Sequence, residues 1–253
     1  MSGTSAPFAA ANGVLLEVDG LVVRYKSLVA VNGLSMHVGA NTIVGLIGPN
    51  GAGKSSAINA IAGAVRAAGG NVRLHGRSIA ALRPDERARL GIARTFQNLE
   101  LFATLTVFDN VLARIDATPS HRTTSTADRR VICQRAIDDL GLTQYADTIV
   151  SDLAYAERKL VEFARATVVE APLLLLDEPT AGIAIEERRR LVQRIAARLR
   201  ERGIACIVVE HDMEVIKTMC DHVYVMDAGV CIAEGTYAEV SQSPAVRTAY
   251  LGT

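Results

Sequence analysis

The stretch that most constrains the fold is Gly48-Pro49-Asn50-Gly51-Ala52-Gly53-Lys54-Ser55-Ser56. It follows a short apolar run at residues 43–47 and precedes residues 57–62, Ala-Ile-Asn-Ala-Ile-Ala, whose sequence is typical of a helix. A strand, a glycine-rich turn with Lys-Ser and a helix together form the context of a phosphate-binding P-loop. The sequence therefore predicts an α/β fold in which this loop joins a buried strand to a helix.

The residue types of this loop suit a phosphate chain and a metal ion. Glycine lets the backbone approach a phosphate without a Cβ in the way, and the loop N–H groups form an anion-binding nest at a helix N-terminus. Lys54 adds a positive charge for the β- and γ-phosphates, and the Ser55 hydroxyl suits Mg²⁺, which prefers oxygen ligands. The predicted nucleotide-binding residues of the loop are Gly48, Asn50, Gly51, Gly53, Lys54, Ser55 and Ser56.

The overall composition excludes several classes of protein. Of the 253 residues, 49 % are apolar and 21 % are charged, as in a globular protein. Because 27 Lys and Arg balance 27 Asp and Glu, no net field draws the chain to nucleic acid, and no nucleic-acid partner is predicted. No apolar run nears the roughly 20 residues of a membrane-spanning helix. Residues 1–13 are predicted to be a flexible tail ahead of one domain over residues 14–253.

The hydrophobic pattern predicts a mixed α/β organisation. Residues 14–25 and 29–38 alternate apolar and polar side chains, which indicates an N-terminal antiparallel β subdomain. The runs 173–176 and 204–209 are continuously apolar, as in strands buried on both faces of a parallel sheet. Residues 98–169 are rich in helical patterns and are predicted to be a helical subdomain inserted into the α/β core.

Two later segments complete this pattern. The helix predicted over residues 186–202 carries three arginines at 188–190, which are interpreted as a solvated face that pairs with Glu186 and Glu187. Apolar runs on either side of Asp-Ala-Gly then predict a hairpin over residues 223–233.

Candidate functional side chains follow the predicted strands at the P-loop, Gln97, Asp177 with Glu178, and His211. Because ligands of an open parallel sheet bind beyond the carboxyl ends of its strands, we expect these residues to gather at one edge. Asp177 and Gln97 would hold Mg²⁺ together with the loop serine. Glu178 would act as general base on a water aimed at the γ-phosphate, and His211 would position that water. The predicted reaction is phosphoanhydride hydrolysis by positioning and charge stabilisation.

These residues carry a resemblance to the nucleotide-binding subunits of ATP-binding cassette (ABC) transporters over nearly the whole chain. The loop resembles Walker A, residues 173–178 resemble Walker B, Gln97 the Q-loop and His211 the switch histidine. Tyr25 falls where the family keeps an adenine-stacking aromatic. The resemblance implies a P-loop ATPase that binds ATP and Mg²⁺, and whose signature motif acts on the ATP of a partner cassette. That motif falls at Leu153, Ala154, Tyr155, Ala156 and Glu157.

Finer features resemble the branched-chain amino acid importer subunits, a pattern that urea and amide importers share. The implied function is ATP hydrolysis that energises import of branched-chain or related amino acids. The implied partners are a second ATPase subunit, transmembrane permease subunits and, indirectly, a solute-binding protein, at the cytoplasmic face of the plasma membrane as a peripheral subunit. The stretches concerned are Arg94-Thr95-Phe96-Gln97, Glu210-His211-Asp212-Met213, Leu153-Ala154-Tyr155 and Ala249-Tyr250-Leu251-Gly252.

Two positions depart from the family pattern. The signature usually has glycine where this chain has Ala156, and the D-loop usually has Asp or Asn where it has Ala184. Both belong to the half of the protein that reaches across to the partner's ATP. A Cβ at Ala156 is expected to narrow the approach to the γ-phosphate. We therefore expect a heterodimer with one sound and one impaired ATP site.

The segment after Gln97 is unusually apolar. Because an exposed apolar patch usually marks a partner site, the region Leu99–Phe108 is predicted to form a groove for a short cytoplasmic helix of a permease. The alternative is that its side chains fill the helical subdomain. The residues concerned are Leu99, Leu101, Phe102, Leu105 and Phe108.

The sequence leaves other functions open. Cassettes of lipopolysaccharide or other lipid exporters look similar and also end in Tyr-Leu-Gly. A regulatory cassette with weak hydrolysis would fit Ala156 and Ala184. Soluble proteins of this family that act in repair or translation usually contain two cassettes or long coiled-coil insertions, and this chain has neither.

Overall fold

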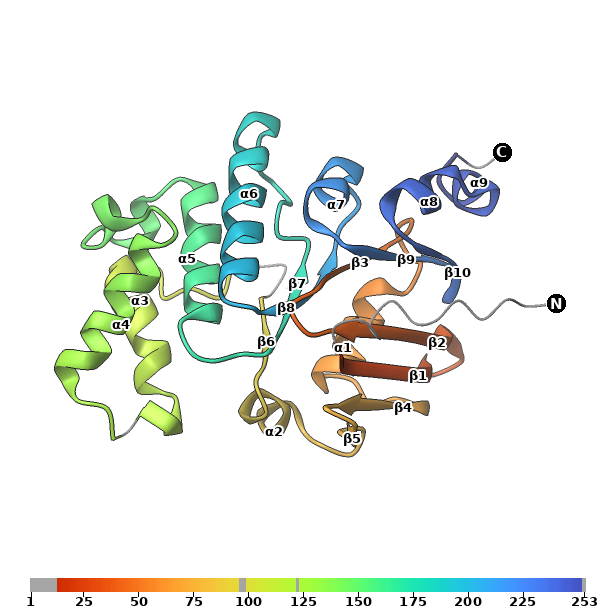
Figure 1. The fold of residues 1–253 in the computed structure, drawn as a ribbon, viewed down its shortest axis with the longest axis horizontal. Coiled ribbons are helices and arrows are strands. Elements are labelled where there is room, and N and C mark those ends of the chain that lie inside the picture. The colour runs from red at the N-terminus through yellow and green to blue at the C-terminus, as the bar shows by residue number, and fades with distance from the viewer. Residues whose placement is uncertain (1–12, 96–98, 122, 252–253) are drawn as a thin grey trace.

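The computed structural model describes residues 13–95, 99–121 and 123–251. Gln97 and all of the predicted tail except Gly13 lie outside these residues. The described strands form two sheets with helices around them (Figure 1). The helices are α1 (Lys54–Ala62), α2 (Pro84–Arg89), α3 (Val107–Asp116), α4 (Thr126–Asp138), α5 (Tyr155–Thr167), α6 (Ile185–Glu201), α7 (Met213–Met219), α8 (Tyr237–Gln242) and α9 (Pro244–Leu251).

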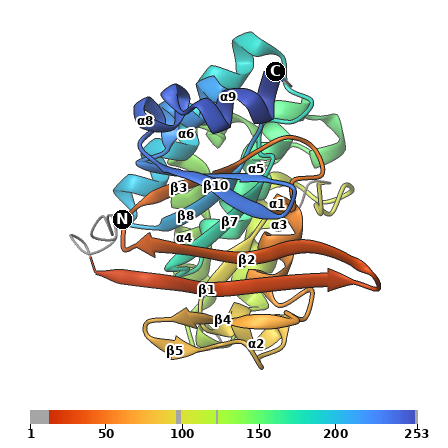
Figure 2. The same ribbon diagram turned by 90° about the vertical axis from the view of Figure 1, so that its right-hand side faces the viewer.

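The smaller sheet is antiparallel and has the strand order β2-β1-β4-β5. The two long strands β1 and β2 lie side by side across the face of the molecule in Figure 2. The N-terminal antiparallel unit is therefore confirmed, and β4 and β5 extend it. The strands are β1 (Val14–Tyr25), β2 (Leu28–Gly39), β4 (Gly69–Leu74) and β5 (Arg77–Ser78).

The larger sheet has the order β10-β9-β3-β8-β7-β6, and every pair except β9–β10 is parallel. The predicted hairpin is confirmed as β9 and β10, but β9 also joins the sheet beside β3, which the sequence pattern did not predict. The strands are β3 (Ile43–Ile47), β6 (Ile92–Arg94), β7 (Leu173–Asp177), β8 (Ala205–Val209), β9 (His222–Asp227) and β10 (Val230–Gly235).

The parallel sheet has apolar side chains packed on both of its faces, which explains its continuously apolar strands. Leu173 and Leu175 pack with α1 and the antiparallel sheet, whereas Leu174 and Leu176 face the opposite way and pack with α3 to α6. Successive side chains of a strand point to opposite faces, so a strand covered on both sides needs no polar residue. The helix α1 consequently lies between the two sheets.

The region between β6 and β7 is helical, as its sequence predicted. It contains α3, α4 and α5, which lie together at one end of the molecule in Figure 1. Their buried faces share one core with α6. No helix of the described residues is long and apolar enough to cross a membrane.

Candidate active site

The P-loop leaves β3 at the carboxyl edge of the parallel sheet and enters α1. Gly48 and Gly53 have φ angles of 149° and 100°. A Cβ at Gly48 would lie 2.0 Å from the carbonyl oxygen of Met226, and one at Gly53 would lie 2.2 Å from that of Ala30. Because fixed backbone fills both spaces, only glycine fits at these two positions.

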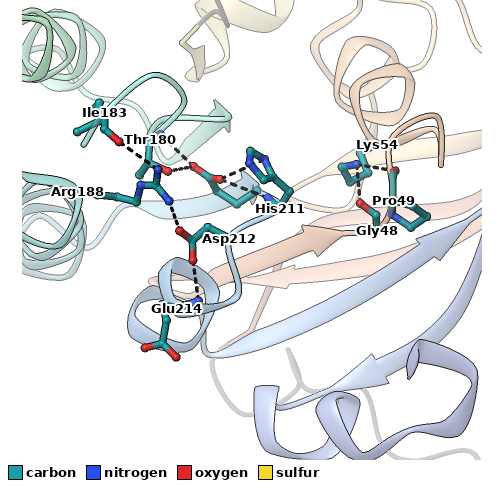
Figure 3. Close-up of polar contacts among 10 residues, drawn as sticks. Gly48, Pro49, Lys54, Thr180, Ile183, Arg188, His211, Asp212 and Glu214 are labelled. Atoms are coloured by element: carbon teal, nitrogen blue, oxygen red, sulfur yellow. Dashed lines mark hydrogen bonds and ion pairs between the residues drawn. The ribbon is translucent and has the colours of Figure 1, made fainter. Parts of the chain in front are cut away.

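Lys54 opens α1 with its side chain folded back into the loop. Its Nζ donates hydrogen bonds to the carbonyl oxygens of Gly48 (2.8 Å) and Pro49 (3.0 Å) (Figure 3). Burial lowers the pKa of Lys54, and the charges of Glu178 and Asp177 act in the opposite direction. An ammonium bonded to neutral carbonyls can exchange them for phosphate oxygens, because bonds between two charged groups are stronger.

A cavity of about 490 Å³ opens beside the loop. Its wall includes every predicted nucleotide-binding residue except Gly48, together with Glu178. Tyr25, at the end of β1, is 41 % exposed and lies at this cavity. The sequence did not point to the other wall residues, which carry no polar side chain to mark them. They are Leu28, Val29, Ala30, Ala228 and Gly229.

Two acidic residues lie at the carboxyl end of β7: Asp177 is its last residue, and Glu178 follows it and lines the cavity. Asp177 is buried, and its Oδ2 accepts a hydrogen bond from Nη2 of Arg94 (3.1 Å), whose Nη1 donates to Oδ1 of Asn59 in α1 (2.6 Å). Glu178 has a φ of 49°, in the left-handed region, and its N–H donates to the carbonyl of Val209 (2.9 Å). Such a conformation costs a non-glycine residue about 1–3 kcal/mol and is often found at functional sites.

The donor set at this edge fits Mg²⁺. The Ser55 hydroxyl and the Asp177 carboxylate offer oxygen ligands, which hard cations prefer. Within the described residues, no three His, Cys, Asp or Glu side chains gather as a metal cage. Mg²⁺ ordinarily uses one or two protein ligands with phosphate oxygens rather than such a cage. Gln97, the third predicted ligand, is not among the described residues.

His211 follows β8, the neighbour of β7 in the sheet. Its side chain is 58 % exposed, and its Nδ1 lies 3.9 Å from Oε2 of Glu210, whose side chain is fully buried. Asp177 pairs with Val209, two residues before His211, and neither Asp177 nor His211 lines the cavity. The sequence prediction singled out His211 and missed Glu210.

The signature residues open α5, away from the cavity wall. Leu153 and Ala156 are 5 % and 8 % exposed and belong to the core around α5. Ala156 therefore packs against this core, and its effect on the approach to a partner's phosphate stays a prediction. Ala154 and Ala184 occupy the N-cap positions of α5 and α6 without a side-chain hydrogen bond.

The apolar segment after β6 is partly exposed. Phe102 and Leu105 are 53 % and 38 % exposed, whereas Leu101 and Phe108 pack against the core. The Arg165 guanidinium lies 5.4 Å from the centre of the Phe102 ring. Arg165 also lines a second cavity of about 410 Å³, between α1, α2, β6, α3 and α5. Some side chains of the segment thus fill the core and others face solvent, and the docking groove stays a prediction.

Two family models match this chain. The model described as ABC transporter matches residues 31–181, which is more than half of the chain. The model described as branched-chain amino acid ATP-binding cassette transporter matches residues 230–253.

Known proteins are similar over nearly the full length. The high-affinity branched-chain amino acid transport ATP-binding protein BraF of Pseudomonas aeruginosa is 34 % identical, over 94 % of this chain and 98 % of its own. The lipopolysaccharide export system ATP-binding protein LptB of Haemophilus influenzae is 33 % identical, over 94 % and 97 %. A solved ATP-binding cassette of an ABC transporter in its ADP conformation is 28 % identical with a TM-score of 0.82, over 95 % and 99 %. The chain therefore belongs to the ABC transporter family, as one of its ATP-hydrolysing ATP-binding cassettes.

Proposed function

We propose that this cassette energises an importer of branched-chain or related amino acids. The observation that carries the solute class is the match of residues 230–253 to the branched-chain cassette family. The similarity to BraF, a branched-chain amino acid transport protein by name, supports the same class. The cassette would work at the cytoplasmic face of the plasma membrane as a peripheral subunit, and a solute-binding protein would deliver the amino acid.

Three side chains would carry the chemistry of hydrolysis. Glu178 takes the proton of the attacking water as general base, and His211 positions this water against the γ-phosphate. Lys54 and the loop N–H groups stabilise the negative charge on the phosphate oxygens. The strained backbone of Glu178 and its place in the cavity wall support this assignment.

The remaining site residues would hold the nucleotide and its metal. Ser55, Asp177 and Gln97 would hold Mg²⁺, which when bound neutralises charge between the β- and γ-phosphates. Tyr25 would stack on the adenine ring, because it is a half-exposed aromatic in the wall of the cavity that the P-loop lines.

ATP would lie between two cassettes, with the signature residues Leu153–Glu157 acting on the partner's nucleotide. The short side chain of Ala184 lacks the hydrogen-bonding groups that Asp or Asn would offer across the interface. We therefore infer a heterodimer in which the partner supplies an intact signature and D-loop to the ATP of this chain. Ala184 is exposed, as a residue at an interface between separate cassettes would be in a single chain.

The permease subunits would dock at the region Leu99–Phe108. The exposed side chains of Phe102 and Leu105 offer apolar area that a separate subunit can cover. Arg165 connects this area to the cavity of about 410 Å³ beside it, which has room for the side chains of a short helix. The location next to β6 would link docking to Gln97, the predicted Mg²⁺ ligand of the Q-loop.

An exporter of lipopolysaccharide or lipid is the second candidate, favoured by the similarity to LptB. Transport by a reconstituted complex separates the two. The chain is purified with its permeases, placed in liposomes containing ATP, and supplied with the solute-binding protein and radiolabelled leucine. We expect leucine uptake that is lost with Glu178→Gln. ATP hydrolysis that ignores leucine, isoleucine and valine but rises with lipopolysaccharide would refute the importer.

A further inference from the structure

One buried carboxylate joins the two segments that carry the proposed general base and the switch histidine. The side chain of Glu210 is fully buried. Its Oε1 accepts hydrogen bonds from the N–H (2.9 Å) and the hydroxyl (2.7 Å) of Thr180, and its Oε2 accepts from the N–H of His211 (3.3 Å) (Figure 3). Glu210 therefore bonds at once to the turn after Glu178 and to the backbone of His211.

The bond to Thr180 restrains a strained turn. Glu178 lies two residues earlier with a φ of 49°, and its carbonyl accepts from the N–H of Ala181 (3.1 Å). A non-glycine residue keeps a left-handed backbone conformation only when the surrounding structure restrains it. Two hydrogen bonds from Thr180 to a buried carboxylate supply such a restraint, and a charged acceptor makes each of them stronger than a neutral one would.

A second bridge holds the same two segments together. Arg188 of α6 forms an ion pair with Asp212 and donates from Nη2 to the carbonyl of Ile183 (3.0 Å) (Figure 3). Asp212 in turn accepts from the N–H of Glu214 and caps α7. Arg188 thus pairs across the fold with Asp212, instead of with its helix neighbours as its sequence position had indicated. Residues 180–183 and 210–212 are consequently held at two points.

We propose that Glu210 is a positioning residue that holds Glu178 and His211 in the relative positions that hydrolysis requires. This inference rests on the roles proposed above for those two residues. A carboxylate offers acceptors at both ends, which matches N–H and O–H donors on Thr180 and an N–H donor on His211. Glutamine would keep an acceptor for Thr180 but turn an NH₂ group towards the N–H of His211, so Glu210→Gln disturbs mainly the histidine side.

The test compares two buried threonines, Thr180 and Thr167, which are each 2 % exposed. The Thr167 hydroxyl donates to the carbonyl of Phe163 (2.8 Å) and lies outside this network, so Thr167→Val is the matched control. Steady-state ATPase of the transporter complex gives kcat and KM, calorimetry gives the ATP Kd, and thermal unfolding gives Tm. We expect Glu210→Gln and Thr180→Val to lower kcat about tenfold or more, with the ATP Kd within about twofold of the parent (about 1.4 kcal/mol per tenfold).

Rescue and a measurement without turnover complete the test. Thr180→Ser keeps the hydroxyl and should restore kcat, and hydrogen exchange of residues 178–184 should be faster in Thr180→Val than in Thr167→Val. Parent kcat in Thr180→Val, an equal loss in Thr167→Val, or no rescue by serine overturns the proposal. If the chain fails to bind ATP, the proposed function fails, whereas the exchange difference still reports on the restraint by Glu210.

Discussion

Replacing Lys54 with alanine removes the one cation among the described residues of the cavity wall. Its Nζ donates hydrogen bonds to two carbonyl oxygens of the loop, at 2.8 and 3.0 Å. Binding of ATP must exchange these contacts for phosphate oxygens. The free energy of ATP binding that Lys54→Ala loses is therefore the attraction of the ammonium group for phosphate minus the energy of the two hydrogen bonds that it gives up.

Both quantities can be placed to an order of magnitude. A unit charge about 4 Å from another at an effective dielectric constant of about 20 contributes about 4 kcal/mol. Each carbonyl bond given up is worth about 1 kcal/mol. The difference of about 2 kcal/mol predicts an ATP Kd about 30-fold higher in Lys54→Ala.

Calorimetry with Mg-ATP measures this change, and Lys217→Ala is the control, because it removes the same charge from an exposed side chain on α7. The pH dependence adds a second check. Burial lowers the pKa of Lys54 below 10.5, so rising pH removes the charge earlier than at an exposed lysine, and the parent should lose affinity. Lys54→Ala should lack this loss. An unchanged Kd in Lys54→Ala would refute the phosphate-binding role.

Four further predictions concern single substitutions elsewhere in the cassette. Glu178→Gln should retain ATP affinity and lower turnover about 10²–10⁴-fold in a phosphate-release assay, because an amide cannot take the proton of water. Phe102→Glu should reduce co-purification with the permeases while the ATP Kd stays unchanged; intact assembly and transport would contradict the docking region. Ala184→Asp should raise the ATPase rate of the heterodimer and, as a new N-cap of α6, raise the free energy of unfolding by about 1 kcal/mol. Burial lowers the pKa of His222 below 6.5, so the unfolded chain takes up the proton first and stability falls as the pH drops through 6.5; urea unfolding of His222→Phe should show a shallower fall.

Most of the fold could be predicted because its signals are local. The four consecutive leucines at 173–176 predict a buried strand by their composition alone. The strand, turn and helix of the P-loop are likewise predicted from consecutive residues. The partner of β9 in the sheet could not be predicted, since any of several parallel strands would suit its sequence. Sheet neighbours depend on the path of the whole chain.

The candidate site likewise combines residues that local sequence signals predict with contacts between distant residues that they do not. Residues of the P-loop, Walker B and switch motifs were predicted individually from their chemistry and position. The bonds between Arg94 and Asp177, 83 residues apart, and between Thr180 and Glu210, 30 residues apart, have no such signal. Glu210 in particular looks like a solvated acid in the sequence, and only the packing of two neighbouring strand ends shows that it is buried.

The close approach of other backbone to the P-loop glycines has a consequence for how cassettes diverge. Gly48 and Gly53 are required by the carbonyl groups of Met226 and Ala30, which belong to the same chain. A descendant that had stopped binding ATP would still be selected to keep both glycines, because losing them would damage its fold. The exposed hydroxyl of Ser55 is under no comparable steric demand. In such a lineage both glycines would be kept after ATP binding had been lost. Substitution of Ser55 would then be the earlier sign that ATP binding had been lost.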